Sequence, residues 1–234
     1  MRALRVQQVQ TMPRIAMHKL GLYTTADARQ RRAIVKNQKR PREFSSMRYF
    51  DAREAMIDHL LDGETDPSAL FLVIEYLASG YLGSTWASQN AALCIEALSH
   101  FLKWQDYTPW RRMKLARGPE SPPPVDLCGV WVDVGPDIIL RGENRNGRPI
   151  VGALKLHLSK TQPLDAESGQ NIAALLHHYA SSTLARPGET ASAGRCMVWD
   201  VFSGTLHSAP KANLTRLHVM EACCEEIAFR WPAA

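Results

Sequence analysis

The sequence of 234 residues lacks the short motifs that would define its chemistry directly. It contains no Gly-x-x-x-x-Gly-Lys-Ser/Thr loop, no Gly-x-Gly-x-x-Gly turn, no Gly-x-Ser-x-Gly elbow and no His-Glu-x-x-His helix. The common nucleotide-binding, dinucleotide-binding, serine-hydrolase and zinc-protease interpretations therefore lose their main support.

Long hydrophobic runs are also missing. The apolar stretch from Ala69 to Leu82 is interrupted by Glu75 and is too short to cross a bilayer. The first eight residues, with Arg2 and Arg5, lack the apolar core of a secretory signal. We therefore expect a cytoplasmic protein that has no membrane partner.

The five cysteines form neither a Cys-x-x-Cys pair nor an even-numbered set. A zinc ribbon and a disulfide framework are accordingly not indicated, and we expect buried thiols. Cys224 falls in line with Leu217, Met220 and Ile227 as a packing residue of a C-terminal helix.

What the chain does contain is 45% hydrophobic residues, which is enough for one α/β domain or for a larger domain with a small appendage. The net charge is +5, and its basic side chains are concentrated near the N-terminus. Such a patch binds phosphates by releasing condensed counterions. A solvated helix face, a flexible basic arm and a surface for acidic proteins are the alternatives. The candidate nucleic-acid-binding residues are Arg29, Arg31, Arg32, Lys36, Lys39, Arg40 and Arg42.

The segment between Arg42 and Asp62 has the apolar spacing of a helix that packs on the rest of the protein. Arg48 and Arg53 are expected to stay outside. The apolar positions are Phe44, Met47, Phe50, Met56, Ile57, Leu60 and Leu61.

Two segments alternate in hydrophobicity and predict two strands, over residues 130–140 and 150–159. Asn146-Gly147 lies between them and favours a hairpin turn. Polar side chains on one face of a hairpin converge, so Asp137, Lys155 and His157, and also Asp133, are candidates for one site.

A carboxylate and a lysine on neighbouring strands could hold a divalent cation and orient or deprotonate a water molecule. The alternative is that Asp137 is a turn or strand-entry residue after Gly135-Pro136, and that Lys155 and His157 belong to a solvated strand face.

Pro136-Asp137, followed by Ala153-Leu154-Lys155, resembles the signature of the PD-(D/E)XK nuclease superfamily, with Ala153 in the place of the second acidic residue. The surroundings are most similar to the RecB-like branch. A helix capped by Ser84 precedes the sheet, a helix over residues 165–180 with Gln170 and Tyr179 follows, and a strand over 197–202 extends the sheet. The resemblance implies an α/β fold with a central mixed β-sheet flanked by helices, which is restriction-endonuclease-like. A helical basic N-terminal region is expected over residues 1–83 and a nuclease-like core over 84–234.

The resemblance also implies catalytic roles for Asp137 and Lys155, with Asp137 as a Mg²⁺ ligand. Asp133, Glu96, Glu167 or His157 could replace the missing acid. We therefore expect a protein that binds DNA or RNA and could be a divalent-metal-dependent phosphodiesterase in foreign-DNA defence, mobile-element functions or repair. The alternative is a catalytically inactive interaction or adaptor subunit that joins other protein subunits in a larger machine.

Overall fold

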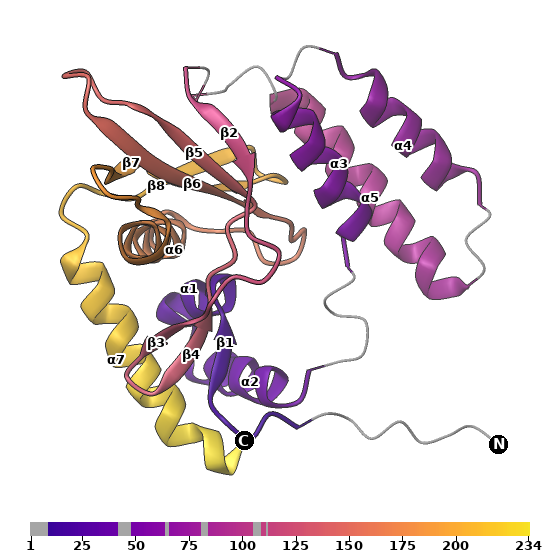
Figure 1. The fold of residues 1–234 in the computed structure, drawn as a ribbon. Helices are drawn as coiled ribbons and strands as arrows, with labels where there is room; N and C mark the ends of the chain where they lie inside the picture. Colours follow the sequence, from indigo (N-terminus) through magenta and orange to yellow (C-terminus); the bar gives the residue numbers. More distant parts are fainter. Residues whose placement is uncertain (1–8, 42–47, 64–65, 81–83, 105–108, 111) are drawn as a thin grey trace.

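The structure is a computed structural model that describes residues 9–41, 48–63, 66–80, 84–104, 109–110 and 112–234. Its centre is a five-stranded sheet in the order β2-β5-β6-β7-β8 (Figure 1). The β6–β7 pair is parallel and the other pairs are antiparallel, so the sheet is mixed. These strands are β2 (Lys114–Arg117), β5 (Ile138–Glu143), β6 (Pro149–His157), β7 (Thr190–Asp200) and β8 (Thr205–Ser208).

A smaller three-stranded sheet has the order β1-β4-β3. Its strands are β1 (Arg14–Ala16), β4 (Val130–Asp133) and β3 (Val125–Leu127). The helices are α1 (Met17–Thr25), α2 (Ala28–Lys39), α3 (Phe50–Leu61), α4 (Ser68–Ala78), α5 (Thr85–Trp104), α6 (Ala166–Tyr179) and α7 (Leu214–Arg230). A π-helical turn continues α6, and a 3₁₀ turn over Trp231–Ala233 continues α7. Among the described residues, no helix is long and apolar enough to cross a membrane.

Both faces of the five-stranded sheet are buried. On β6, Val151 and Ala153 belong to the core beneath α6, whereas Leu154 and Leu156 belong to the core shared with α3 and α5. Figure 1 shows α6 on one side of the sheet and α3, α4 and α5 grouped on the other. The predicted α/β class, with a central mixed sheet flanked by helices, is confirmed.

The predicted hairpin is also confirmed, since β5 pairs with β6 from Ile138↔Leu154 to Glu143↔Pro149. In its turn, the carboxamide oxygen of Asn144 accepts hydrogen bonds from the amides of Asn146 (2.9 Å) and Arg148 (3.0 Å). Gly147 has a φ of 70°, a conformation that glycine adopts without strain.

The prediction of one continuous strand from Val130 to Leu140 is wrong. The chain leaves the small sheet after Asp133 and enters the large sheet at Ile138, with Gly135-Pro136 between them. Proline has no amide hydrogen for a ladder, so the strand ends there although the hydrophobic alternation continues. Asp133 therefore lies on a different sheet from Asp137, where it pairs with Arg14 at 2.7 Å.

The helices predicted around the sheet are present. Ser84 Oγ accepts a hydrogen bond from the amide of Ala87 (3.2 Å) at the start of α5, and Leu98 and Phe101 of that helix are buried. The Asp165 carboxylate accepts from the amide of Ser168 (2.6 Å) at the start of α6. Of the strand predicted over residues 197–202, residues 197–200 form the end of β7, whereas residues 201 and 202 belong to the turn that leads to β8.

The N-terminal region contributes to both cores. Helix α1 packs with α6 and α7, and α2 contacts the 3₁₀ turn that follows α7, whereas α3 packs with α4 and α5. The predicted boundary between residues 83 and 84 falls in the connection between α4 and α5, which contact each other. Of the apolar residues predicted to pack near α3, Met56, Ile57 and Leu60 are buried. Phe50 is exposed, contrary to the prediction, and Phe44 and Met47 lie outside the described residues.

Cys94, Cys196, Cys223 and Cys224 are buried as expected, and Cys224 lies in one core with Met220 and Ile227. Cys128 is exposed, and in this it differs from the prediction. It lies with a φ of 51° in the turn between β3 and β4, so its side chain points away from the cores.

Candidate functional site

Asp137 is held at the entrance to β5 by its backbone. Its amide donates to the carbonyl oxygen of Leu154 (2.9 Å), and its carbonyl oxygen accepts from the amide of Gly118 (2.9 Å). A Cβ atom at Gly118 would lie 1.9 Å from the carbonyl oxygen of Pro136. Glycine is therefore needed at position 118 for the end of β2 to approach the Pro136-Asp137 segment this closely.

The side chain of Asp137 is saturated by donors. Lys155 Nζ donates to Oδ1 (2.9 Å), and the amide of Leu156 donates to Oδ2 (2.7 Å). Arg53 Nη1 donates to both oxygens, at 3.1 Å and 2.9 Å. The residue is only 8% exposed. We call Arg53, Asp137 and Lys155 the buried triad; it holds two cations and one carboxylate.

Burial and charge oppose each other in the buried triad. Burial raises the pKa of Asp137, but the cations of Lys155 and Arg53 and the Leu156 amide outweigh it, so this pKa lies below its usual value. Burial also lowers the pKa of Lys155, against the opposing effect of Asp137. The structure thus brings Asp137 and Lys155 together as predicted.

Arg53 is a site residue that sequence analysis placed wrongly, on the outside of its helix. Its guanidinium reaches Asp137 and also donates to the carbonyl oxygen of Leu156 (3.2 Å). The sequence did contain a signal, because Arg53, Met56, Ile57 and Leu60 follow i, i+3, i+4, i+7 spacing and share one helix face.

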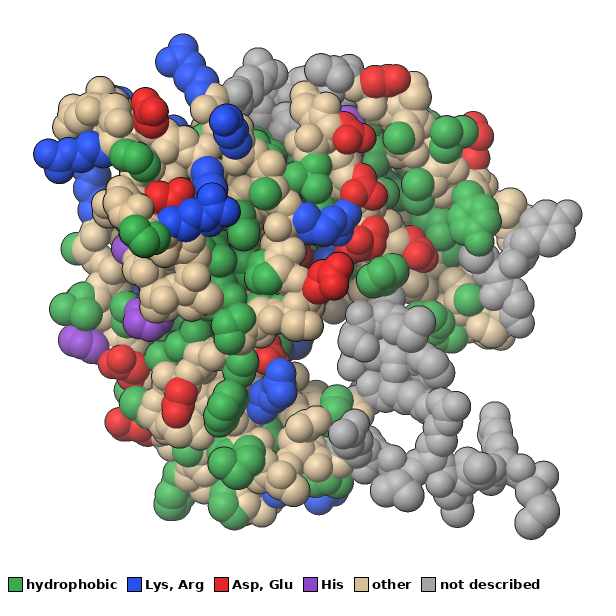
Figure 2. Space-filling model, in the orientation of Figure 1, with side chains coloured by type: hydrophobic (Ala, Val, Ile, Leu, Met, Phe, Trp, Pro, Cys, Tyr) green, Lys and Arg blue, Asp and Glu red, His purple; other side chains and the backbone are tan. Residues whose placement is uncertain are grey.

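The orientation of α3 is fixed by a second ion-pair group. Arg117 on β2 donates to Glu54 (2.7 Å) and Asp58 (2.5 Å) of α3. On the face drawn in Figure 2, acidic side chains gather over α3 and hydrophobic side chains over α4. The exposed large apolar residues of α4 are Phe71, Leu72 and Tyr76. Arg53 is therefore directed at Asp137 by a helix that is tied to the sheet.

The donor set around Asp137 does not fit Mg²⁺, which prefers several oxygen ligands with waters. Both carboxylate oxygens already accept hydrogen bonds from cations. Ala153, in the place of the second acid, is fully buried beneath α6 and lies beside Cys196 of β7. Within the described part of the chain, no group of three or more His, Cys, Asp and Glu side chains is placed to hold a metal ion.

The proposed replacements for the missing acid have other partners or lie elsewhere. Asp133 pairs with Arg14, and Glu96 pairs with Lys160 (2.7 Å). His157 Nε2 donates to the carbonyl oxygen of Gln162 (2.8 Å). Glu167 is exposed in the first turn of α6 and does not line the cleft beside the triad.

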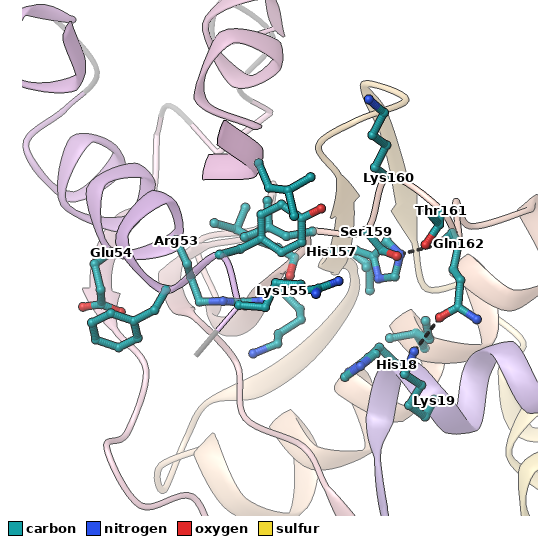
Figure 3. A pocket seen from close by; sticks show the side chains of 18 of the residues that line it. His18, Lys19, Arg53, Glu54, Lys155, His157, Ser159, Lys160, Thr161 and Gln162 are labelled. Atoms are coloured by element: carbon teal, nitrogen blue, oxygen red, sulfur yellow. Dashed lines mark hydrogen bonds between the residues drawn. The ribbon is translucent and has the colours of Figure 1, made fainter. Parts of the chain in front are cut away.

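A cleft of about 600 Å³ opens beside the buried triad (Figure 3). It lies between α3 and α5 on one side and α1 and the loop after β6 on the other. Its lining contains two residues of the triad and three further cations, and among the described lining residues the acid is Glu54. We call it the cationic cleft; its basic residues are Lys19, Arg48, Arg53, Lys155 and Lys160.

Two histidines, His18 and His157, line the cationic cleft with ring centroids 6.2 Å apart. Burial, followed by the positive charge of Lys19, lowers the pKa of His18 well below its usual value. Burial also lowers the pKa of His157, against the raising effect of the Gln162 carbonyl. Both rings are therefore held in an environment that disfavours their protonation.

The predicted basic patch is largely α2, and two of its members, Arg31 and Lys39, have partners outside that helix. Arg31 donates to Glu226 of α7 (2.8 Å) and lies 5.0 Å over the ring of Tyr23. Lys39 donates to the carbonyl oxygens of Trp231 (2.7 Å) and Pro232 (3.1 Å). These contacts fasten α2 to the C-terminal segment. Exposed on α2 and its end are Arg29, Arg32, Lys36 and Arg40, whereas Arg42 lies outside the described residues.

Comparison with known proteins identifies no relative of this chain. No protein-family model matches the chain, and a search of curated proteins finds no match.

Proposed function

We propose that this protein binds nucleic acid through the phosphates, which occupy the cationic cleft, and that it does so as a binding or adaptor subunit without metal-dependent cleavage. The observation that carries the proposal is the buried triad, in which the one carboxylate is neutralised by Arg53 and Lys155 at 2.9 Å each. Two cations against one anion leave a positive site, which favours an anionic ligand over a metal ion.

The arrangement of strands supports a nuclease-like origin for this fold. Asp137 precedes β5, Lys155 lies on the neighbouring β6, and α6 connects β6 to the parallel strand β7. Helix α5 precedes the sheet, as the resemblance to the RecB-like branch implies. Since one fold can host several activities, the charges of the site decide between cleavage and binding.

Phosphates are the ligand that the cleft matches best. Lysine and arginine bind phosphate oxygens, and a set of such contacts gives affinity that decreases steeply with salt. The exposed cations of α2 could extend this surface for a polymer, which a single small anion would not need.

Binding can be tested by fluorescence anisotropy with labelled single-stranded DNA, duplex DNA and RNA over a series of salt concentrations. Arg48→Ala removes an exposed cation of the cleft, and Arg145→Ala is a matched control because Arg145 is exposed and does not line the cleft. We expect binding that weakens with salt, with the logarithmic salt slope reduced by about 1 in Arg48→Ala only. Salt-insensitive binding, or equal losses in both variants, would contradict the proposal.

Cleavage is tested with the same substrates in Mg²⁺ or Mn²⁺. We expect intact substrate with the wild type and with Asp137→Asn. Cleavage by the wild type that disappears in Asp137→Asn but persists in Asp133→Asn would establish a metal-dependent nuclease instead.

A further inference from the structure

A second groove adjoins the cationic cleft. Its volume is about 460 Å³, and it shares Lys19, Thr161 and Gln162 with the lining of the cleft. Figure 3 shows Lys19 and Gln162 joined at the edge of the cleft by a hydrogen bond. Because the linings overlap, an extended ligand could pass from one site into the other.

The side of this groove formed by α2 and the loop after β6 is rich in carboxamides. The amides that line it are Gln30, Asn37, Gln38 and Gln162, and we call this site the amide groove. On α2, positions 30, 34, 37 and 38 follow the spacing of one helix face, so the three amides of α2 are presented together.

Three of these amides have a fixed orientation. The Oε1 atom of Gln38 accepts from the amide of Ala16 (2.9 Å), and that of Gln30 accepts from the amide of Asp27 (3.1 Å). Backbone amides can only donate, so the bonded atom is the oxygen in each case. Lys19 Nζ, also a donor, holds Oε1 of Gln162 at 2.5 Å.

Because these oxygens are engaged, the NH₂ groups of Gln30, Gln38 and Gln162 are the amide atoms left to donate to a ligand in the groove. Its lining also includes Asp165, a carboxylate whose pKa is lowered chiefly by the Ser168 amide and hydroxyl against the effect of burial. Lys19 and Asp165 are the cation and the anion among the described residues of this lining, so the groove has no net positive charge to hold a phosphate. The groove thus selects an uncharged group that carries hydrogen-bond acceptors.

We propose that the amide groove binds unpaired bases of a single strand whose phosphates lie in the cationic cleft. This inference rests on the proposed function. Carbonyl oxygens and ring nitrogens of bases are acceptors that Asn and Gln amides recognise, and they are free on the Watson–Crick edges of unpaired bases only. A duplex keeps those edges paired.

The inference is tested with two labelled single strands of equal length, one with bases and one abasic, so that both have the same phosphates. The main variant is Gln38→Glu, which keeps an oxygen for Ala16 and replaces the NH₂ donor by a carboxylate. Gln89→Glu adds the same charge at an exposed position of α5 that does not line the groove. Asn37→Ala, at an exposed position, removes a donor without adding charge.

We expect the wild type to bind the base-bearing strand more tightly than the abasic strand and the duplex. In Gln38→Glu the base-bearing strand should lose roughly three- to tenfold in affinity, the size of one hydrogen bond. Asn37→Ala should lose less, and Gln89→Glu should resemble the wild type.

The possible failures are distinguishable. Equal affinity for the two strands, or an equal loss on both strands in Gln38→Glu, would overturn the base-binding inference while the proposed phosphate binding stands. Binding to neither strand would overturn the proposed function and this inference with it.

Discussion

Replacing Asp137 by alanine should lower the free energy of unfolding, because the substitution leaves Arg53 and Lys155 beside each other without a counter-charge. The substitution also leaves the amide of Leu156 without its 2.7 Å acceptor. A carboxylate reserved for a metal would behave differently, since its removal from a cluster of acids relieves repulsion and costs little in the metal-free protein.

The expected loss follows from the burial of the triad. Breaking a buried ion pair by removing one partner costs about 3–5 kcal/mol. The side chains of Arg53 and Lys155 are 27% and 21% exposed and can recover some hydration, against 7% for Asp137. We therefore expect the lower end, about 3 kcal/mol in the free energy of unfolding. For a chain of this size that corresponds to about 6–12 °C in the melting temperature.

The assay is urea unfolding at neutral pH, followed by tryptophan fluorescence. Asp133→Ala is the matched control, because Asp133 pairs with Arg14 through side chains that are 40% and 52% exposed. An exposed pair contributes about 0–1 kcal/mol. Lys155→Met in the Asp137→Ala background removes one of the two cations that have lost their counter-charge. It should therefore recover part of the lost free energy of unfolding, since residues in contact have interaction energies of about 0.5–3 kcal/mol. A loss in Asp137→Ala no larger than that in Asp133→Ala would refute the structural role of the triad.

Three further predictions follow from the same geometry. The free energy of unfolding should fall as the pH drops below about 6.5, because His18 takes up a proton in the unfolded chain more readily than in the folded chain. His18→Gln should flatten this part of a urea-unfolding series measured against pH. An unchanged curve in the variant would contradict the lowered pKa of His18. Gly118→Ala should lower the free energy of unfolding by about 1–3 kcal/mol in the same measurement, because the added Cβ atom would meet the carbonyl oxygen of Pro136. A neutral effect would show that the Pro136-Asp137 segment can move away from position 118. Ala153→Glu should destabilise the protein without creating a metal site, because position 153 is fully buried. The measurement is thermal unfolding with and without Mg²⁺, with Ala153→Gln as the control. A Mg²⁺-dependent rise in the melting temperature of the Glu variant alone would contradict this prediction.

The sequence predicted those parts of the fold that depend on neighbouring segments. The β5–β6 hairpin has a short connection with a suitable turn, so Asp137 and Lys155 could be placed side by side from alternation alone. The break between β4 and β5 was missed because the apolar alternation continues through Gly135-Pro136. Alternation records which side chains face a core, but it does not say which sheet a strand joins.

Contacts between segments that are distant in the chain could not be predicted from the sequence. Arg31 counts as one positive charge in the basic patch, yet its partner Glu226 lies on the C-terminal helix. Lys39 similarly donates to carbonyl oxygens near the end of the chain. A charge run shows how many cations are present, whereas the fold decides which of them are engaged.

Ala153 and Arg53 together support the proposal that the site takes an anion. Ala153 is closed into the core beneath α6, so a carboxylate there could not reach solvent or a metal without displacing that packing. Arg53 of α3 places its positive charge against both carboxylate oxygens of Asp137. In a metal site, the metal ion would supply this charge. A metal ion can exchange and carry water, but a guanidinium is part of the chain and is always charged. We therefore propose that an external anion balances the charge of the cleft, and the phosphates of a nucleic acid would supply such anions in a continuous row.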